Sequence, residues 1–341
     1  MNRHVPASPH LPPQALEAMV AMATMAPSMH NTQPWRFRLE PGTQTISLYA
    51  DPARMLRVAD ADGRALHISC GAALFNLRLA AAAAGRQALV RLLPDPDRPL
   101  LLAIVRLAGS WHAQQSELEL HAAISARHTN RSPFSGRPVP PGVLAELAEA
   151  ARLEGAVLHF PGGQETSRLL RLAREAELEL LADPAYRAEL ARWAGGERDR
   201  EGIPEEALGP RDPSGATPVR DFTPGRPGPA RYDWFEEQPQ VAVLSTPFGE
   251  RADWLRAGQA LERVLLVAET RGIAVSPLTP PLETADTWLV RDPSSALEYP
   301  QMILRLGYGL PGRAPPCRRP VGEVLDSPEA EGATHWGPSV L

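Results

Sequence analysis

Two arginines and a hydroxyl alternate in the stretch "RHTNRSPF" (127–134), where Arg127, Thr129 and Arg131 are separated by single residues. In an extended segment alternate side chains point to the same side, so both guanidinium groups and the hydroxyl would face one ligand. Such a set suits a phosphate group, because guanidinium groups make charge-assisted, bidentate hydrogen bonds to its oxygens. A solvated basic connection is the alternative interpretation.

A second polar run, "MAPSMHNTQPWRF" (25–37), follows an alanine-rich stretch with helical spacing. Pro27 is expected to end that helix, and Ser28 and Asn31 are small polar groups that can face a planar ligand. Trp35 and Phe37 alternate with Arg36, which predicts a strand anchored in the core. The alternative is a turn without a ligand, stabilised by its own Ser and Asn side chains.

Two weaker motifs lie near the C-terminus of the chain. In "GIAVSPLTP" (272–280), Ser276 and Pro277 occupy a short, partly rigid loop whose backbone groups can face the edge of a ring. In "PPCRRP" (315–320), Arg318 and Arg319 can join a phosphate site. Taken alone, the first is equally a plain turn and the second a solvated basic pair.

Composition limits the classes of function. The chain has 341 residues, 43% of them hydrophobic, which is enough for one large domain or two smaller ones. A formal net charge of −5 argues against extended nucleic-acid binding. Two cysteines exclude a disulfide framework, and neither a signal peptide nor a membrane-spanning run is recognisable. We therefore expect a cytoplasmic protein with no nucleic-acid or membrane partner.

Internal similarity indicates a duplication. "GAALFNLRLAAAAAG" (71–85) matches "GQALERVLLVAETRG" (258–272) at six of fifteen positions, including Gly71 with Gly258. Two further pairs recur in the same order: 11–23 with 139–151, and 101–109 with 301–309. Small residues on one side of both helices predict close packing at the centre of the fold. Alignment of alanine-rich helices by composition alone is the alternative.

The patterns predict an α+β fold of tandem duplicated halves that form a covalent pseudo-dimer, residues 1–115 and 116–341. The first half is predicted to contain helices 13–25 and 66–84 and strands 34–40, 45–50 and 100–107. The second is predicted to contain helices 116–126, 141–153, 165–182 and 252–271 and strands 156–160, 240–245 and 301–306. A Pro-rich, lid-like insertion interrupts the second half at about 185–235.

Together the four motifs resemble the FMN-dependent nitroreductase family. "APSMHNTQPWRF" is similar to its APSxxNxQPW loop, and "RHTNR" to its phosphate motif. "RAGQALERVLLVAETRGIAVSP" and "MILRLGYG…RRP" resemble its central helix with the flavin-edge loop and its closing strand with the basic tail. The presence of only one complete motif set in a duplicated chain resembles the actinobacterial, Acg-like branch with two fused halves.

The resemblance implies one FMN per chain, bound across the seam between the halves. It implies that Arg127, Thr129 and Arg131, with Arg318 or Arg319, bind the phosphate. It also implies that Pro27, Ser28, Met29 and Asn31 flank the ring from the first half, and that Ser276, Pro277 and Leu278 meet its other edge. No catalytic side chain or metal is required, because the flavin carries the hydride. The role of His30 is left open.

The same resemblance implies hydride transfer from NAD(P)H through FMN to a small acceptor, such as a nitro compound, a quinone or a dedicated metabolite. The alternative is a lid-closed FMN-sequestering or storage protein, because a closed insertion would block the substrate channel. Tyr232, Trp234 or Phe235 would then lie near the ring. A monomeric pseudo-dimer or a weak homodimer is expected.

Overall fold

The computed structural model describes residues 10–195, 198–215, 217–224, 231–284, 290, 298–310 and 317–326. Its helices are α1 (Pro13–Thr24), α2 (Arg64–Ala83), α3 (Gln115–Ala123), α4 (Pro141–Arg152), α5 (Gly163–Ala182), α6 (Pro184–Trp193), α7 (Arg251–Thr270) and α8 (Val321–Val324). Its strands are β1 (Trp35–Glu40), β2 (Thr45–Ala50), β3 (Gln87–Leu92), β4 (Leu101–Ala108), β5 (Val157–His159), β6 (Gln240–Thr246), β7 (Ala274–Pro277) and β8 (Tyr299–Gly307).

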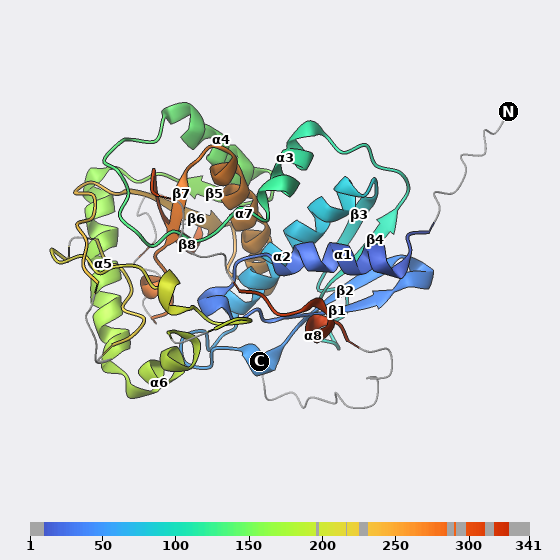
Figure 1. The fold of residues 1–341 in the computed structure, drawn as a ribbon, viewed down its shortest axis with the longest axis horizontal. Helices are drawn as coiled ribbons and strands as arrows, with labels where there is room; N and C mark the ends of the chain where they lie inside the picture. The colour runs from blue at the N-terminus through green and yellow to red at the C-terminus, as the bar shows by residue number, and fades with distance from the viewer. Residues whose placement is uncertain are drawn as a thin grey trace.

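Two four-stranded antiparallel sheets lie on either side of the central helices (Figure 1). The strand order is β1-β2-β4-β3 in the first sheet and β5-β6-β8-β7 in the second. The two orders are equivalent, and the repeated strands β4 and β8 hold the same place in each. Each central pairing also carries one register irregularity, after Leu48 in β2 and after Leu244 in β6. The predicted α+β fold with two similar halves is confirmed.

The repeated helices α2 and α7 cross at the centre of the molecule (Figure 1). A Cβ atom on Gly71 would lie 2.2 Å from the carbonyl oxygen of Leu255, and one on Gly258 would lie 2.0 Å from that of Ile68. Leu255 and Ile68 each precede the local glycine by three residues, so the contact has the same form in both directions. Glycine is required at both positions because any side chain would overlap the partner backbone.

The helix crossing also joins the two hydrophobic cores. Leu255 of α7 is buried in the core of the first half, beside Cys70 and Leu74. Ile68 of α2 is buried in the core of the second half, beside Leu261 and Leu265. Each central helix therefore contributes an aliphatic side chain to the opposite core, and the halves cannot separate without exposing both.

Four elements have no counterpart in the sequence-based prediction: β3, β7, α6 and the single-turn helix α8 (Figure 1). Alternate residues of β3 are exposed and half-buried, so no continuous apolar run marks the strand. Strand β7 has four residues and ends in Pro277, so its sequence is typical of a turn. It is a strand because it pairs with β8. Helix α6 occupies the start of the predicted insertion, parts of which (196–197, 216 and 225–230) lie outside the described residues.

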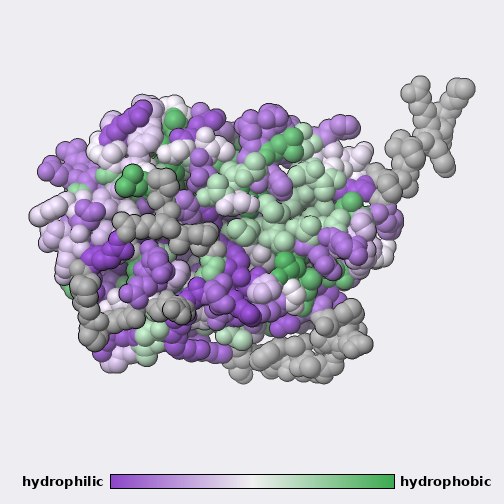
Figure 2. Space-filling view, in the orientation of Figure 1, coloured by the Kyte–Doolittle hydropathy of each residue, from purple (hydrophilic) through white to green (hydrophobic). Residues whose placement is uncertain are grey.

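Helix α2 is long and apolar enough to cross a membrane by composition alone, but 89% of its most apolar window is buried inside the protein. Its length and hydropathy therefore fit a core helix as well as a membrane span. On the face shown in Figure 2, a mildly hydrophobic area covers α1, and hydrophobic and polar residues are mixed below it, towards α8.

Candidate ligand site between the two halves

The loop after α1 is held in an unusual backbone conformation. His30, Asn31 and Gln33 have φ angles of 50°, 56° and 51°, a left-handed region that non-glycine residues adopt infrequently. The backbone N–H of Gln33 donates to Ser28 Oγ at 2.9 Å, and the backbone N–H of Met29 donates to Ser69 Oγ of α2 at 3.4 Å. These bonds fix the loop against the central helix. Backbone strain of this kind is typical of functional sites.

A large cavity opens where this loop meets α2, α7 and the strands of the second sheet. Its empty volume is about 1120 Å³, part of it open to solvent. Ile68, Leu261, Leu265 and Met302 give it an apolar wall. Eight predicted site residues line it: Pro27, Ser28, Met29, Thr129, Arg131, Ser276, Pro277 and Leu278. The structure thus brings the first three motifs together from both halves.

A smaller pocket adjoins the cavity and shares four of its lining residues, Pro27, Ser28, Thr129 and Arg131. We call it the arginine pocket. Arg127 and Arg318 complete its basic lining, with Asn31 from the first half. Burial and the charge of Arg127 lower the pKa of Arg318 to about 9, and burial with the charge of Arg220 lowers that of Arg131 to about 10. The pocket therefore concentrates positive charge in a place with little water.

One carboxylate partly balances this charge. Glu262 of α7 is fully buried, and its Oε1 lies 3.6 Å from Arg127 Nε. Burial raises the pKa of Glu262, and the charges of Arg127 and Arg318 act against that rise. The Nε atoms of Arg127 and Arg318 are buried without a hydrogen-bond partner among the described residues. One carboxylate for three guanidinium groups leaves a net positive charge that suits an anionic group.

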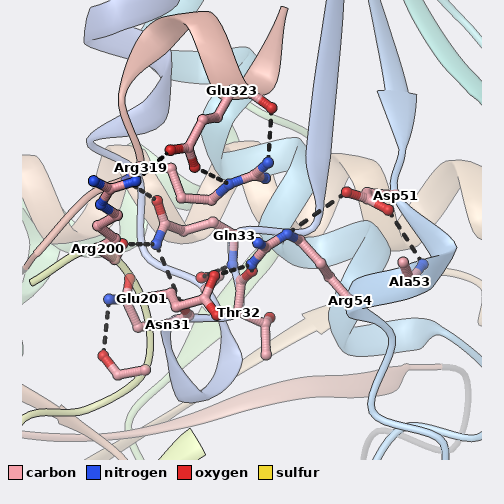
Figure 3. Close-up of polar contacts among 12 residues, drawn as sticks. Asn31, Thr32, Gln33, Asp51, Ala53, Arg54, Arg200, Glu201, Arg319 and Glu323 are labelled. Carbon is pink, nitrogen blue, oxygen red and sulfur yellow. Dashed lines mark hydrogen bonds and ion pairs between the residues drawn. The ribbon is translucent and has the colours of Figure 1, made fainter. Parts of the chain in front are cut away.

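Arg319 is the one predicted residue that lines neither hollow. Its amide donates to Gln33 Oε1 at 2.9 Å, and its guanidinium group donates to the Glu323 carbonyl at 2.7 Å (Figure 3). Arg318, by contrast, donates to Asn31 Oδ1 at 3.0 Å and to the carbonyls of Met25 and Ala26. Only Arg318 of the basic pair is therefore positioned for a bound anion.

Polar side chains of the loop after α1 form hydrogen bonds to a segment that crosses the site. We call residues 198–215 and 217–224 the covering segment. Asn31 Nδ2 donates to the Gly202 carbonyl at 2.9 Å, and Gln33 Nε2 donates to the Arg200 carbonyl at 2.7 Å (Figure 3). Glu201 pairs with Arg54 at 2.6 Å. The side-chain amide of Asn31 thus bonds to the covering segment through Nδ2 and to Arg318, near the C-terminus, through Oδ1.

The covering segment also enters the cavity, through Pro218, Val219, Arg220 and Phe222. The aromatic residues expected there are elsewhere, so that expectation was wrong. Tyr232 and Trp234 are 61% and 73% exposed, and Phe235 lies against Arg305, whose guanidinium carbon is 5.0 Å from its ring centroid.

Several residues that shape the site were not recognised in the sequence. Arg220, Arg305 and Arg64 line the cavity, and Glu262 lies behind the arginine pocket. The sequence could have revealed such residues only as charged side chains among the apolar positions of a helix or a central strand. Glu262 in α7 and Arg305 in β8 meet this condition. Arg220 does not, because it lies in a Pro-rich stretch without periodicity. Its position depends on partners distant in sequence.

The cavity and the arginine pocket together form a hollow with an apolar wall and a basic end, lined by residues of both halves. In the comparison with known proteins, the model of the nitroreductase family matches residues 124–308. A Mycobacterium tuberculosis protein named "Putative NAD(P)H nitroreductase Rv3131" is 36% identical over 96% of this chain and 94% of its own length. Another from that organism, "Putative NAD(P)H nitroreductase acg", is 33% identical over 91% and 95%. The chain belongs to the nitroreductase family, and its predicted resemblance to Acg is confirmed.

Solved structures give more distant likenesses. A nitroreductase with bound FMN from Bacteroides fragilis covers 57% of this chain and 91% of its own, at 16% identity and a TM-score of 0.34. A protein titled as a putative nitroreductase from Anabaena variabilis covers 91% and 93%, at 10% identity and a TM-score of 0.48.

Proposed function

We propose that the protein is an FMN-binding oxidoreductase of the nitroreductase type, with one flavin per chain in the cavity between its halves. The observation that carries this proposal is the arginine pocket, in which Arg127, Arg131 and Arg318 line one end of an apolar cavity. A phosphate there would neutralise guanidinium groups that a single buried carboxylate leaves in excess. Each charge-assisted hydrogen bond to it contributes about 1.5–3 kcal/mol.

The side chains of the cavity have binding roles in this proposal. Ile68, Leu261 and Met302 provide an apolar surface for a planar ring, and Thr129 and Ser276 line the same space. Pro27, Ser28 and Met29 approach from the first half, and Pro277 and Leu278 from the second. When bound, FMN supplies the hydride chemistry between NAD(P)H and a small acceptor such as a nitro compound or a quinone. The chain binds, orients and shields it.

A second candidate function is FMN sequestration with little turnover. It is favoured by the covering segment, which places Val219, Arg220 and Phe222 inside the cavity. A donor or an acceptor that must reach the ring would have to displace these side chains. The two candidates therefore differ in how often the covering segment opens.

We also propose that residues 1–115 and 116–341 are the halves of a covalent pseudo-dimer that functions as a monomer or a weak homodimer in the cytoplasm. The equivalent sheet orders and the mutual contact of Gly71 and Gly258 support this arrangement. A single chain already provides both sides of the cavity.

The test is flavin binding followed by anaerobic mixing with NADH or NADPH. We expect purified protein, as isolated or after reconstitution with FMN, to show the visible absorption of an oxidised flavin. Its absence in both preparations contradicts the proposal. Rapid bleaching by the reduced nicotinamide supports the oxidoreductase, and bleaching only after deletion of residues 200–230 supports sequestration.

A further inference from the structure

One side chain of the covering segment, Arg220, contacts three other parts of the fold. Arg220 is buried and donates to Glu283 Oε1 at 2.6 Å, while its Nε lies 3.5 Å from Glu177 of α5. Its Nη1 lies 2.9 Å from His30 Nε2 in the loop of the first half. Tyr186 of α6 donates to the other oxygen of Glu283 at 3.1 Å. Arg220 therefore joins the covering segment to both halves.

The contact with His30 requires an uncharged imidazole. A guanidinium group has donors only, so His30 Nε2 must accept and the single ring proton lies on Nδ1. A protonated imidazole donates from both nitrogens and cannot accept this bond. The same protonation would place a second positive charge 2.9 Å from Arg220. The bond and the charge state of His30 are thus linked by geometry.

The surroundings keep His30 uncharged while the segment is closed. Burial, and then the charges of Arg220 and Arg131, lower its pKa well below 6.5. The Phe222 ring stands edge-on to the imidazole with centroids 6.0 Å apart. The carboxylates of Glu177 and Glu283 are engaged by Arg220. An opened segment would remove Arg220 and Phe222 together and return His30 to water.

We propose that His30 is an acid-sensitive contact of the covering segment: protonation of its imidazole breaks the bond to Arg220 and shifts the segment towards an open state. The contact exists without any flavin. Its consequence, access to the cavity, rests on the proposed function.

The direction of the pH effect follows from proton linkage. An exposed imidazole takes up a proton near pH 6.5, and the closed state takes one up only at much lower pH. The ratio of open to closed states should therefore rise about tenfold for each pH unit below 6.5. Glu177 opposes this trend, because burial raises its pKa in the closed state, so a proton on this carboxyl favours closure. A Glu177→Gln variant removes that opposing group.

The experiment measures hydrogen exchange of residues 198–224 by mass spectrometry at pH 7.5, 6.5 and 5.5, corrected for intrinsic exchange rates. Wild-type and Glu177→Gln proteins should lose protection by up to about tenfold per pH unit below 6.5. His30→Gln should not, because glutamine offers a carbonyl acceptor that does not titrate in this range. Glutamine also fits the backbone, since Gln33 and Gln44 already have φ angles of 51° and 53°.

An equal loss of protection in His30→Gln, or none in the wild type, would overturn the proposal. A second measurement does not depend on that variant: NMR titration of the imidazole should give His30 a pKa far below 6.5 in the wild type and a higher pKa in Arg220→Gln, which lacks the neighbouring charge. The same titration in both proteins would also overturn it. Both measurements use protein without flavin, so their outcome is separate from that of the FMN test.

Discussion

Gly71 and Gly258 pack against each other where α2 crosses α7, and each leaves room only for the backbone of the other helix. A Cβ atom on Gly258 would lie 2.8 Å from the Cα of Gly71, and one on Gly71 would lie 3.0 Å from the Cα of Gly258. The two positions are equivalent in the internal repeat. This is the self-complementary contact that a two-fold symmetric dimer makes, here within one chain.

Substitution of either central glycine by alanine should destabilise the protein. The added methyl group would meet a backbone carbonyl, which cannot rotate away, so the helices must move apart. Overpacking of this kind costs about 1–3 kcal/mol or more. Chemical denaturation of Gly71→Ala and Gly258→Ala should show losses of similar size, because the two sites are equivalent.

The matched control is Gly142, in the first turn of α4, where a Cβ atom would meet nothing within 4 Å. Gly142→Ala should be neutral or stabilising by up to about 1 kcal/mol, since alanine favours helix. Equal stability of all three variants would show that the crossing tolerates separation.

Loss of Arg318 should weaken FMN far more than riboflavin. Its guanidinium group lines the arginine pocket, and riboflavin lacks the phosphate that would bind there. Arg318→Met should reduce FMN affinity about tenfold to a hundredfold, the equivalent of about 1.5–3 kcal/mol for a charged hydrogen bond. Isothermal titration with both flavins measures the difference.

The adjacent residue provides the control. Arg319 bonds to Gln33 and Glu323 and lines neither hollow, so Arg319→Met should retain FMN affinity. If both variants lose FMN equally, or if Arg318→Met loses riboflavin to the same extent, the phosphate is not bound by Arg318.

FMN titration should reach an end point at one flavin per chain. The internal repeat aligns Phe75 of α2 with Glu262 of α7, so the equivalent of the arginine pocket would lie beside Phe75. That place holds Glu154, which pairs with Arg78 at 2.5 Å and with Arg263 at 2.8 Å. Both guanidinium groups also lie over the Phe75 ring. An end point of two would show that this cluster opens for a ligand.

The sequence was most informative where local chemistry determines structure. Repeated glycines and small residues indicated the central helices, and alternating arginines indicated the arginine pocket. It was least informative where distant segments decide the outcome. Ser28, Asn31 and Arg318 were predicted from their residue types alone. The sequence did not indicate that Asn31 also donates a hydrogen bond to the Gly202 carbonyl of the covering segment. Nor did it indicate that Arg319 bonds to Glu323 and points away from the arginine pocket. The burial of Arg220 depends on Glu177, Glu283 and His30, and no local pattern marks that convergence.

Stability should fall in mild acid because of His67. Burial lowers the pKa of this histidine to about 4, while Nδ1 lies 2.6 Å from the Gly63 carbonyl and Nε2 accepts from Arg251 at 3.0 Å. The unfolded chain binds a proton near pH 6.5 that the folded chain does not bind until about pH 4. Stability is thus unaffected by this group above pH 6.5 and falls between pH 6.5 and 4, by about 3 kcal/mol in total.

Urea unfolding between pH 7.5 and 4.5 measures this effect. His67→Gln should be less stable at pH 7.5 but show a shallower decline, by up to about 1.4 kcal/mol per pH unit. The comparison is made in a His30→Gln background, so that opening of the covering segment does not contribute. An unchanged slope would mean that His67 is already charged in the folded state.

Arg220→Gln should speed reduction of bound flavin by NADH or NADPH. The variant loses the buried charge that joins the covering segment to Glu283 and Glu177. Because a charged hydrogen bond contributes about 1.5–3 kcal/mol, the segment should open about tenfold to a hundredfold more often. Anaerobic stopped-flow absorbance measures the rate. Arg187→Gln on α6 is the control, because among the described residues that side chain donates to the Leu181 and Ala182 carbonyls, which lie outside the cavity. If neither variant changes the rate while flavin remains bound, the covering segment does not limit access and the sequestration alternative loses its structural support.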